Sequence, residues 1–205
     1  MVAMVTRHDE HTTFAPTSTK RMPETARELF DALPELPGFR ADVIEGTLIV
    51  SPVGTPEHAD CAMELYRALL PVMDDQGWKG RAGNVDVCID GPREPVEPDF
   101  VLAPYDCPRW GERELLSSGL IMVAEVVSYS SAGRDRTEKP LLYATGRIPI
   151  YLLIDPIAKS PSVTVHSDID DGVYRAVNQV ALGAPIQLPK PIDIELDTSI
   201  FKSGA

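Results

Sequence analysis

The sequence predicts an α/β fold, a mixed β-sheet flanked by helices, with a helix and a β-hairpin ahead of it. Two apolar segments, LIMVAEVVS at residues 120–128 and IPIYLLIDP at 148–156, are typical of strands buried on both faces. The segment between them, SSAGRDRTEKPLLYATG at 130–146, has helical spacing and ends at Gly146, which favours helix termination. Such strand–helix–strand units usually pair their strands in parallel with a right-handed crossover.

Length and composition are those of a soluble globular chain. Of the 205 residues, 43% are hydrophobic and 24% are charged. No run approaches the roughly 18 apolar residues that span a bilayer, and the N-terminus has no apolar stretch typical of a signal peptide. We therefore expect a cytoplasmic protein without a membrane partner. The three cysteines show no CxxC spacing, so we expect buried thiols.

The charge balance restricts the expected partners. The net charge is -12, which argues against broad, nonspecific binding to nucleic acid, because such binding relies on many lysine and arginine contacts to phosphate. A local basic site stays open, and an acidic chain suits the binding of divalent cations.

The elements before the first sheet strands can be placed from their turn and cap residues. Residues 1–20 show no periodicity and are expected to form a disordered tail, followed by a single domain over residues 21–205. MPETARELFDALPE (22–35) predicts a short amphipathic helix. GFRADVIEGTLIVSP (38–52) predicts a hairpin that turns at Glu45 and Gly46.

A longer helix and several strands follow. GTPEHADCAMELYRALLPVMDD (54–75) predicts a helix with Thr55 as a possible cap, Pro56 in its first turn and an apolar stripe. VDVCID (85–90) and VEPDFVLAP (96–104) predict strands ahead of the buried strand at 120–128. The last part of the chain, 162–201, predicts short strands separated by turns.

Three of these elements could bring acidic and basic groups together. Asp99 opens a predicted strand, and Glu125 interrupts an apolar one, where an unpaired carboxylate costs several kcal/mol. Asp135, Lys139 and Tyr143 follow at i, i+4 and i+8 and share one helix face. Two carboxylates can hold a divalent cation, and a lysine can orient or deprotonate a water and stabilise charge on a phosphate. The set predicts metal-assisted phosphodiester hydrolysis.

Other residues are auxiliary candidates, and each also has a purely structural interpretation. His58 lies in the first turn of its helix, where it could contact substrate or a metal-bound water, or simply pack locally. Glu45 is a second candidate, although an acidic turn residue needs no function, and Asp42 competes with it on the same hairpin. Tyr143 is a candidate that could equally be a core residue.

The segments EPDFVLAP and VAEVVSYSSAGRDRTEKPLLYATGRIPIYLLID resemble the Uma2 family of endonucleases, once a domain of unknown function. VIEGTLIVSPVGTPEHAD resembles the same family's hairpin and histidine-bearing helix. This family belongs to the PD-(D/E)XK restriction-endonuclease-like superfamily, and the resemblance covers residues 38–157. It implies a restriction-endonuclease-like core, Mg²⁺ or Mn²⁺ as cofactor, and nucleic acid as partner, DNA in preference to RNA.

The resemblance also assigns roles to residues. Asp99 matches the aspartate of the Pro-Asp element and Glu125 the acidic position of the second motif, so both would bind the metal. The lysine expected two residues later is Val127, and Lys139 on the following helix would replace it. Pro140 follows directly, so the helix either begins near Thr137 or is kinked there.

Two functional hypotheses remain open on the sequence. In the first, the protein is an Mg²⁺- or Mn²⁺-dependent endonuclease with Asp99, Glu125 and Lys139 as catalytic residues. In the second, it is a catalytically inactive nuclease-like module that binds or interacts without turnover. An exposed sheet edge or the C-terminal strands could also pair two copies into a homodimer.

Overall fold

A mixed, six-stranded sheet forms the centre of the computed structural model, which describes residues 21–204. Its strand order is β12-β11-β10-β9-β6-β3. The strands span Trp78–Ala82 (β3), Phe100–Pro104 (β6), Met122–Val126 (β9), Ile150–Asp155 (β10), Ser162–Asp170 (β11) and Val173–Ala181 (β12). Only β9 and β10 pair in parallel, and the other neighbours are antiparallel. The tail expected over residues 1–20 lies outside the described residues.

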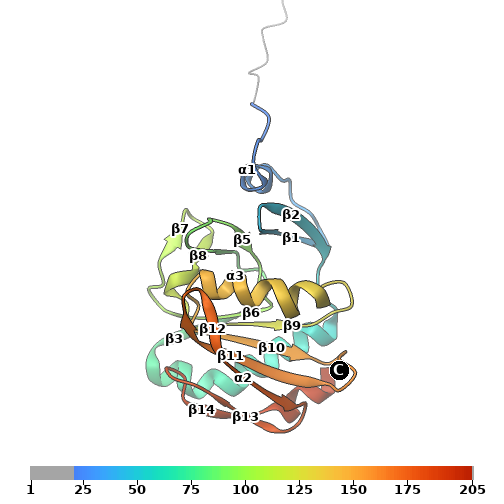
Figure 1. The fold of residues 1–205 in the computed structure, drawn as a ribbon, viewed down its shortest axis with the longest axis vertical. Helices are drawn as coiled ribbons and strands as arrows, with labels where there is room; N and C mark the ends of the chain where they lie inside the picture. Colours follow the sequence, from blue (N-terminus) through green and yellow to red (C-terminus); the bar gives the residue numbers. More distant parts are fainter. Residues whose placement is uncertain (1–20, 205) are drawn as a thin grey trace, which may run out of the picture.

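The strand–helix–strand unit is present as predicted. Strand β9 leads into the π-helical turn η2 (Arg134–Glu138), which continues as α3 (Lys139–Thr145) and returns along parallel strand β10. The α/β fold class is therefore confirmed, with helices on both sides of a mixed sheet (Figure 1).

Each face of the sheet has its own apolar core. Helix α2 (Pro56–Gln76) packs on one face through Cys61, Leu65, Leu69 and Met73. Helix α3 covers the other face with Leu142, Tyr143 and Ala144. In Figure 1 the sheet runs between these two helices, α3 on the side that also carries the N-terminal hairpin. The face under α3 is the one that holds the candidate site.

Smaller elements surround this sandwich. They are α1 (Ala26–Asp31), β1 (Phe39–Ile44), β2 (Thr47–Pro52), β4 (Val87–Cys88), β5 (Pro95–Val96), β7 (Arg109–Trp110), β8 (Glu114–Leu116), η1 (Ser117–Gly119), β13 (Pro185–Leu188), β14 (Ile194–Asp197) and η3 (Thr198–Gly204). Strands β1 and β2 form the predicted hairpin, and its turn residues Glu45 and Gly46 both have positive φ. Strands β4, β5, β7 and β8 form a separate small sheet.

Several boundaries differ from the sequence expectation. The strand expected at 85–90 is reduced to Val87–Cys88, and β3 was not expected at all. Thr55 occupies the N-cap position of α2, but its side chain makes no cap hydrogen bond and contacts His58 instead. Among the described residues, no helix is both long and apolar enough to cross a membrane.

Candidate active site

Glu125 lies in the middle of β9 on the α3 side of the sheet. Strand alternation sends Ala124 and Val126 into the core under α2, whereas Val123 and Val127 enter the core under α3. Glu125 shares the parity of Val123 and Val127 and is completely buried. Val127, where the family resemblance led us to look for a lysine, is apolar and buried in this core.

Helix α3 supplies a lysine beside Glu125 instead. The Lys139 Nζ lies 2.8 Å from Glu125 Oε1, and the Tyr143 hydroxyl donates a hydrogen bond to the same oxygen. One turn earlier, Asp135 Oδ1 lies 3.0 Å from the Lys139 Nζ. Asp135, Lys139 and Tyr143 are all buried, so the helix face predicted from their spacing points into the protein rather than into solvent.

The π-helical turn before Lys139 explains how the helix accommodates Pro140. The Lys139 N–H donates to the carbonyl of Arg134, five residues back, instead of to that of Asp135. The Asp135 carbonyl accepts a hydrogen bond from the Tyr151 hydroxyl of β10 at 2.8 Å. The wide turn avoids the close approach that a proline makes to the preceding turn of a regular helix. Of the two alternatives left by the sequence, the helix is distorted at the site rather than begun there.

Asp99 reaches the same face of the sheet from the neighbouring strand. The register pairs Phe100 with Ala124, so continuing it by one residue brings Asp99 level with Glu125. The Val126 N–H donates to Asp99 Oδ2 at 2.8 Å, which fixes this carboxylate beside β9. Its other oxygen accepts a hydrogen bond at 2.8 Å from Arg40 of β1, a residue that the sequence had not singled out.

The electrostatics of the cluster are dominated by burial. Burial raises the pKa of Glu125 to about 8, Lys139 opposes that rise, and Asp99 and Asp135 reinforce it. For Lys139, burial lowers the pKa, but Glu125 and Asp135 more than compensate, so the pKa rises and the ammonium keeps its charge. The pKa of Arg40 is raised in the same way by Glu125, Asp99 and Asp42.

Two carboxyl groups of the cluster have buried oxygens without a hydrogen-bond partner. Glu125 uses Oε1 for Lys139 and Tyr143, whereas its buried Oε2 has no hydrogen-bond partner. Asp135 Oδ2 is also buried without a partner. Over residues 21–204 no group of three or more acidic, histidine or cysteine side chains is arranged around a metal position. Asp99 and Glu125 are the two carboxylates that could hold Mg²⁺ here, and waters and phosphate oxygens would then supply the other ligands, as Mg²⁺ commonly accepts.

His58 lines a cavity beside Asp99. A cavity of about 240 Å³ is lined by His58, Arg40, Asn84, Glu97 and Asp99, among others. The His58 Nδ1 lies 3.3 Å from the Thr55 hydroxyl, and its Nε2 is buried without a hydrogen-bond partner. The structure therefore brings His58 to the same cleft as Asp99.

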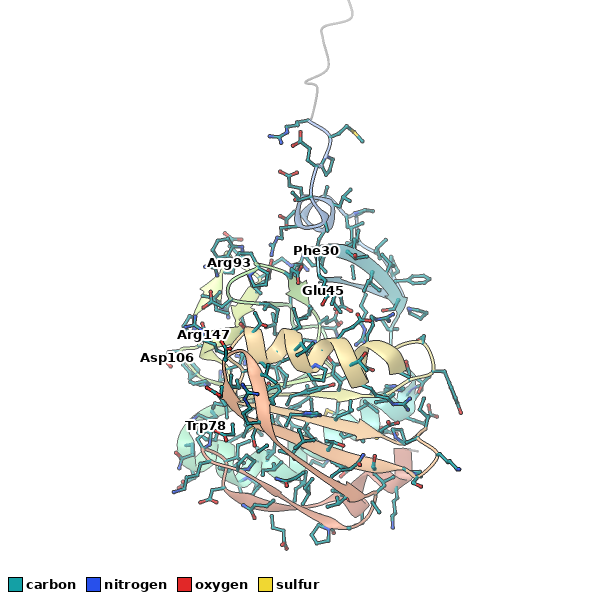
Figure 2. The ribbon with its side chains drawn as sticks, in the orientation of Figure 1. Phe30, Glu45, Trp78, Arg93, Asp106 and Arg147 are labelled. Carbon is teal, nitrogen blue, oxygen red and sulfur yellow. The ribbon has the colours of Figure 1, made fainter. Side chains whose placement is uncertain are left out.

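Glu45 does not join the cluster. Its side chain is exposed at the hairpin turn, and its backbone N–H donates to Glu94 Oε2 at 3.1 Å. Figure 2 shows Glu45 with the hairpin, on the side of α3 away from the sheet. The competing candidate Asp42 is buried and accepts a hydrogen bond from the Glu97 N–H at 2.8 Å. On this hairpin Asp42 and Arg40 lie near the site, and Glu45 does not.

Sequence reasoning missed Arg40 as a site residue and named Asp135 only as part of a helix face. The alternation of β1 held a signal for Arg40, because Arg40 and Asp42 share parity with Ile44, which packs in the core under α3. Nothing in the sequence pattern indicated that this hairpin folds over the opening strand residue Asp99.

The α/β sheet thus brings together a buried carboxylate, a helix lysine bonded to it and a second carboxylate beside the neighbouring strand. The chain belongs to the Uma2 family, described as "Putative restriction endonuclease", whose model matches residues 27–199. This confirms the resemblance seen in the sequence. Membership supports a nuclease-like function and a nucleic-acid substrate.

A solved structure supports the fold independently. The chain is similar to a crystal structure of "a putative nuclease belonging to DUF820" from Anabaena variabilis ATCC 29413, with a TM-score of 0.67 and 19% identity. The match covers 89% of this chain and 99% of the other. At that identity the likeness concerns the fold. No curated protein matches the chain.

Proposed function

We propose that this protein is a divalent-metal-dependent endonuclease that hydrolyses phosphodiester bonds. The observation that carries the proposal is the placement of Asp99 and Glu125 level with each other on adjacent strands, with Lys139 bonded to Glu125. Asp99 and Glu125 would hold Mg²⁺ or Mn²⁺. When bound, such an ion polarises the phosphate and lowers the pKa of an attacking water.

The chain's own residues divide the remaining tasks. Because the pKa of Lys139 is raised, this lysine is a fixed positive charge that orients the water or stabilises the phosphate, rather than a general base. Tyr143 holds the Glu125 carboxylate in place, and Asp135 holds the ammonium of Lys139 from the other side. His58 lines the cleft beside Asp99 and would contact the substrate there.

The finer assignments also belong to this proposal. Duplex DNA is the expected substrate in preference to RNA, as the restriction-endonuclease family description suggests. A cytoplasmic location is consistent with three free, buried thiols, which persist in reducing compartments. A homodimer is supported by the sheet edge at β12, where Val173 and Val177 are exposed.

A metal-binding and cleavage experiment tests the proposal. Mn²⁺ titration by calorimetry should give one binding event in the parent, and supercoiled plasmid should be nicked in the presence of Mn²⁺ or Mg²⁺. Asp99→Asn and Glu125→Gln should lose both metal binding and cleavage while keeping the circular dichroism spectrum of the parent. Cleavage that persists in either variant would remove these residues from the mechanism.

A specific observation also favours the alternative, an inactive nuclease-like module. Asp99 is already paired with Arg40 and Glu125 with Lys139, so both metal carboxylates have protein cations beside them. An inactive module should bind a short DNA duplex equally well with and without Mn²⁺, and should give no calorimetric signal with Mn²⁺ alone. The endonuclease should show the opposite on both measurements.

A further inference from the structure

We propose that Arg40 of β1 occupies the cation position at Asp99 while the site holds no metal, and binds the scissile phosphate once a divalent ion replaces it there. This inference rests on the proposed function and assigns to the hairpin a direct part in substrate binding.

The first observation is the incomplete pairing of Arg40. One terminal nitrogen serves both acceptors, Asp99 Oδ1 at 2.8 Å and the Glu97 carbonyl at 3.3 Å, while the buried Nε has no hydrogen-bond partner. A guanidinium carries five N–H donors in a planar fork that matches two oxygens of a carboxylate or phosphate. Arg40 therefore retains donors that the fold does not use.

Two other arginines of the chain show what a structural pair looks like. Arg136 donates hydrogen bonds to the two carboxylate oxygens of Asp155 from Nε and from a terminal nitrogen, at 2.8 and 3.0 Å. Arg27 donates hydrogen bonds to the carboxylate of Glu114 from both of its terminal nitrogens. In contrast, Arg40 contacts Asp99 through one terminal nitrogen only, so its guanidinium does not form the two-nitrogen pair that it could make with a further anion.

The second observation is the position of Arg40 among the cavities. Arg40 lines the cavity of about 240 Å³ that also contains His58 and Asp99. It lines a neighbouring cavity of about 160 Å³ with Ser128, Ser130 and Ser131, hydroxyl-bearing residues that follow β9. A phosphodiester in the first cavity would lie beside both Asp99 and Arg40, and one in the second would lie beside Arg40 and the serines.

The third observation is the surrounding charge. Arg40 and Lys139 lie among Asp42, Asp99, Glu125 and Asp135, so the cluster carries more carboxylates than cations. An arginine does not release its proton in proteins, so a metal ion can take its place at Asp99 only by displacing the guanidinium. The displaced fork, still attracted by Asp42 and Glu125, would stay in the cleft, where a metal-bound phosphate would provide two oxygens.

Opposite effects on two ligands test the inference. Arg40→Gln removes the competing cation, so its affinity for Mn²⁺ alone should rise by about tenfold, which corresponds to about 1.4 kcal/mol. Its affinity for a short duplex DNA, measured by fluorescence anisotropy with Ca²⁺ in place of Mn²⁺, should fall by about tenfold, because the phosphate loses its fork. The control is Arg175→Gln. Arg175 is an exposed arginine of β12 that pairs with Asp170 of β11, and its variant should match the parent in both assays.

A second variant keeps the test decisive if Arg40→Gln unfolds. Arg40→Lys retains a cation without the fork, so its Mn²⁺ affinity should stay near that of the parent while duplex binding weakens. Unchanged duplex binding in a folded Arg40→Lys or Arg40→Gln protein would overturn the phosphate role. Weaker Mn²⁺ binding in Arg40→Gln would overturn the competition. A parent protein that binds no Mn²⁺ would overturn the proposed function itself. That result is distinct from the two variant results that would overturn the role of Arg40.

Discussion

At the scale of single residues, the contacts of Glu125 explain how a carboxyl group is accommodated in an apolar strand. One of its oxygens is fixed by Lys139 and Tyr143, and the other is buried without a donor. The family resemblance in the sequence assigned Glu125 to metal binding. The contacts with Lys139 and Tyr143 add internal partners to that expectation, so Glu125 also belongs to a structural network.

The raised pKa of Glu125 makes metal binding depend on pH. Because burial raises this pKa from 4.5 to about 8, the carboxyl is largely protonated below pH 8 and must lose a proton to bind an ion. Mn²⁺ affinity should therefore fall by about tenfold for each pH unit below the pKa. Calorimetry in buffers of different ionisation enthalpy should show proton release, and an enthalpy independent of the buffer at pH 7 would contradict it.

The same shift predicts how stability without metal varies with pH. Between pH 4.5 and about 8 the folded protein retains a proton at Glu125 that the unfolded chain has released. The free energy of unfolding should therefore decrease as the pH rises through this window. In Glu125→Gln this part of the pH dependence should disappear, because glutamine does not titrate.

Lys139 should be necessary for stability as well as turnover. Lys139→Met leaves Glu125 and Asp135 buried without their cation, and such uncompensated charge costs about 3–5 kcal/mol. The cost should be smaller at pH 6 than at pH 9, because Glu125 can take up a proton. Urea unfolding at both pH values measures the difference, with Lys159→Met, at an exposed lysine, as the control. An equal loss of unfolding free energy at the two pH values would show that Glu125 does not take up a proton when Lys139 is removed.

At the scale of elements, the sequence predicted the parts that carry a strong pattern. Periodicity and turn residues predicted the two apolar strands around α3 and the hairpin turn at Glu45 and Gly46. Short motifs singled out Asp99, Glu125 and Lys139. Strand β3 was missed because WKGRA has two cations, a central glycine and no β-branched residue, although Trp78 and Ala82 alternate toward the core. Its conformation depends on pairing with β6. The contact between Arg40 and Asp99 joins residues far apart in the chain, which no local pattern specifies.

Strand β3 also depends on a glycine where it crosses the helix α2. A Cβ at Gly80 would lie 2.8 Å from Met73 Sδ and 3.0 Å from both Phe100 and Tyr66. Gly80→Ala should therefore destabilise the protein by about 1–3 kcal/mol through overpacking. The control is Gly133→Ala in the helix before Lys139, where a Cβ meets nothing within 4 Å and φ is helical. Urea unfolding should show a lower unfolding free energy for Gly80→Ala only. An equal decrease in both variants would contradict the close packing at β3.

On the scale of the whole molecule, the acidic charge and the site act in opposite directions. A net charge of -12 repels nucleic acid over the surface as a whole. The candidate site holds Arg40 and the buried Lys139 among a larger number of carboxyl groups, so a bound divalent ion would have to supply the positive charge that attracts phosphate there. Attraction for phosphate would thus be confined to the site and would depend on the metal, so duplex binding should be weak in chelator.

The exposed sheet edge leads to a prediction about assembly. Strand β12 ends the six-stranded sheet, so its outer backbone groups are available to another strand, and Val177 is 56% exposed on it. Two copies paired along β12 would continue one sheet, and the parent should sediment as a dimer. Val177→Lys should shift it toward monomer, because a lysine on an edge strand opposes pairing. Leu70→Lys, at an exposed leucine of α2, should stay dimeric, and a monomeric parent at all concentrations would exclude this interface.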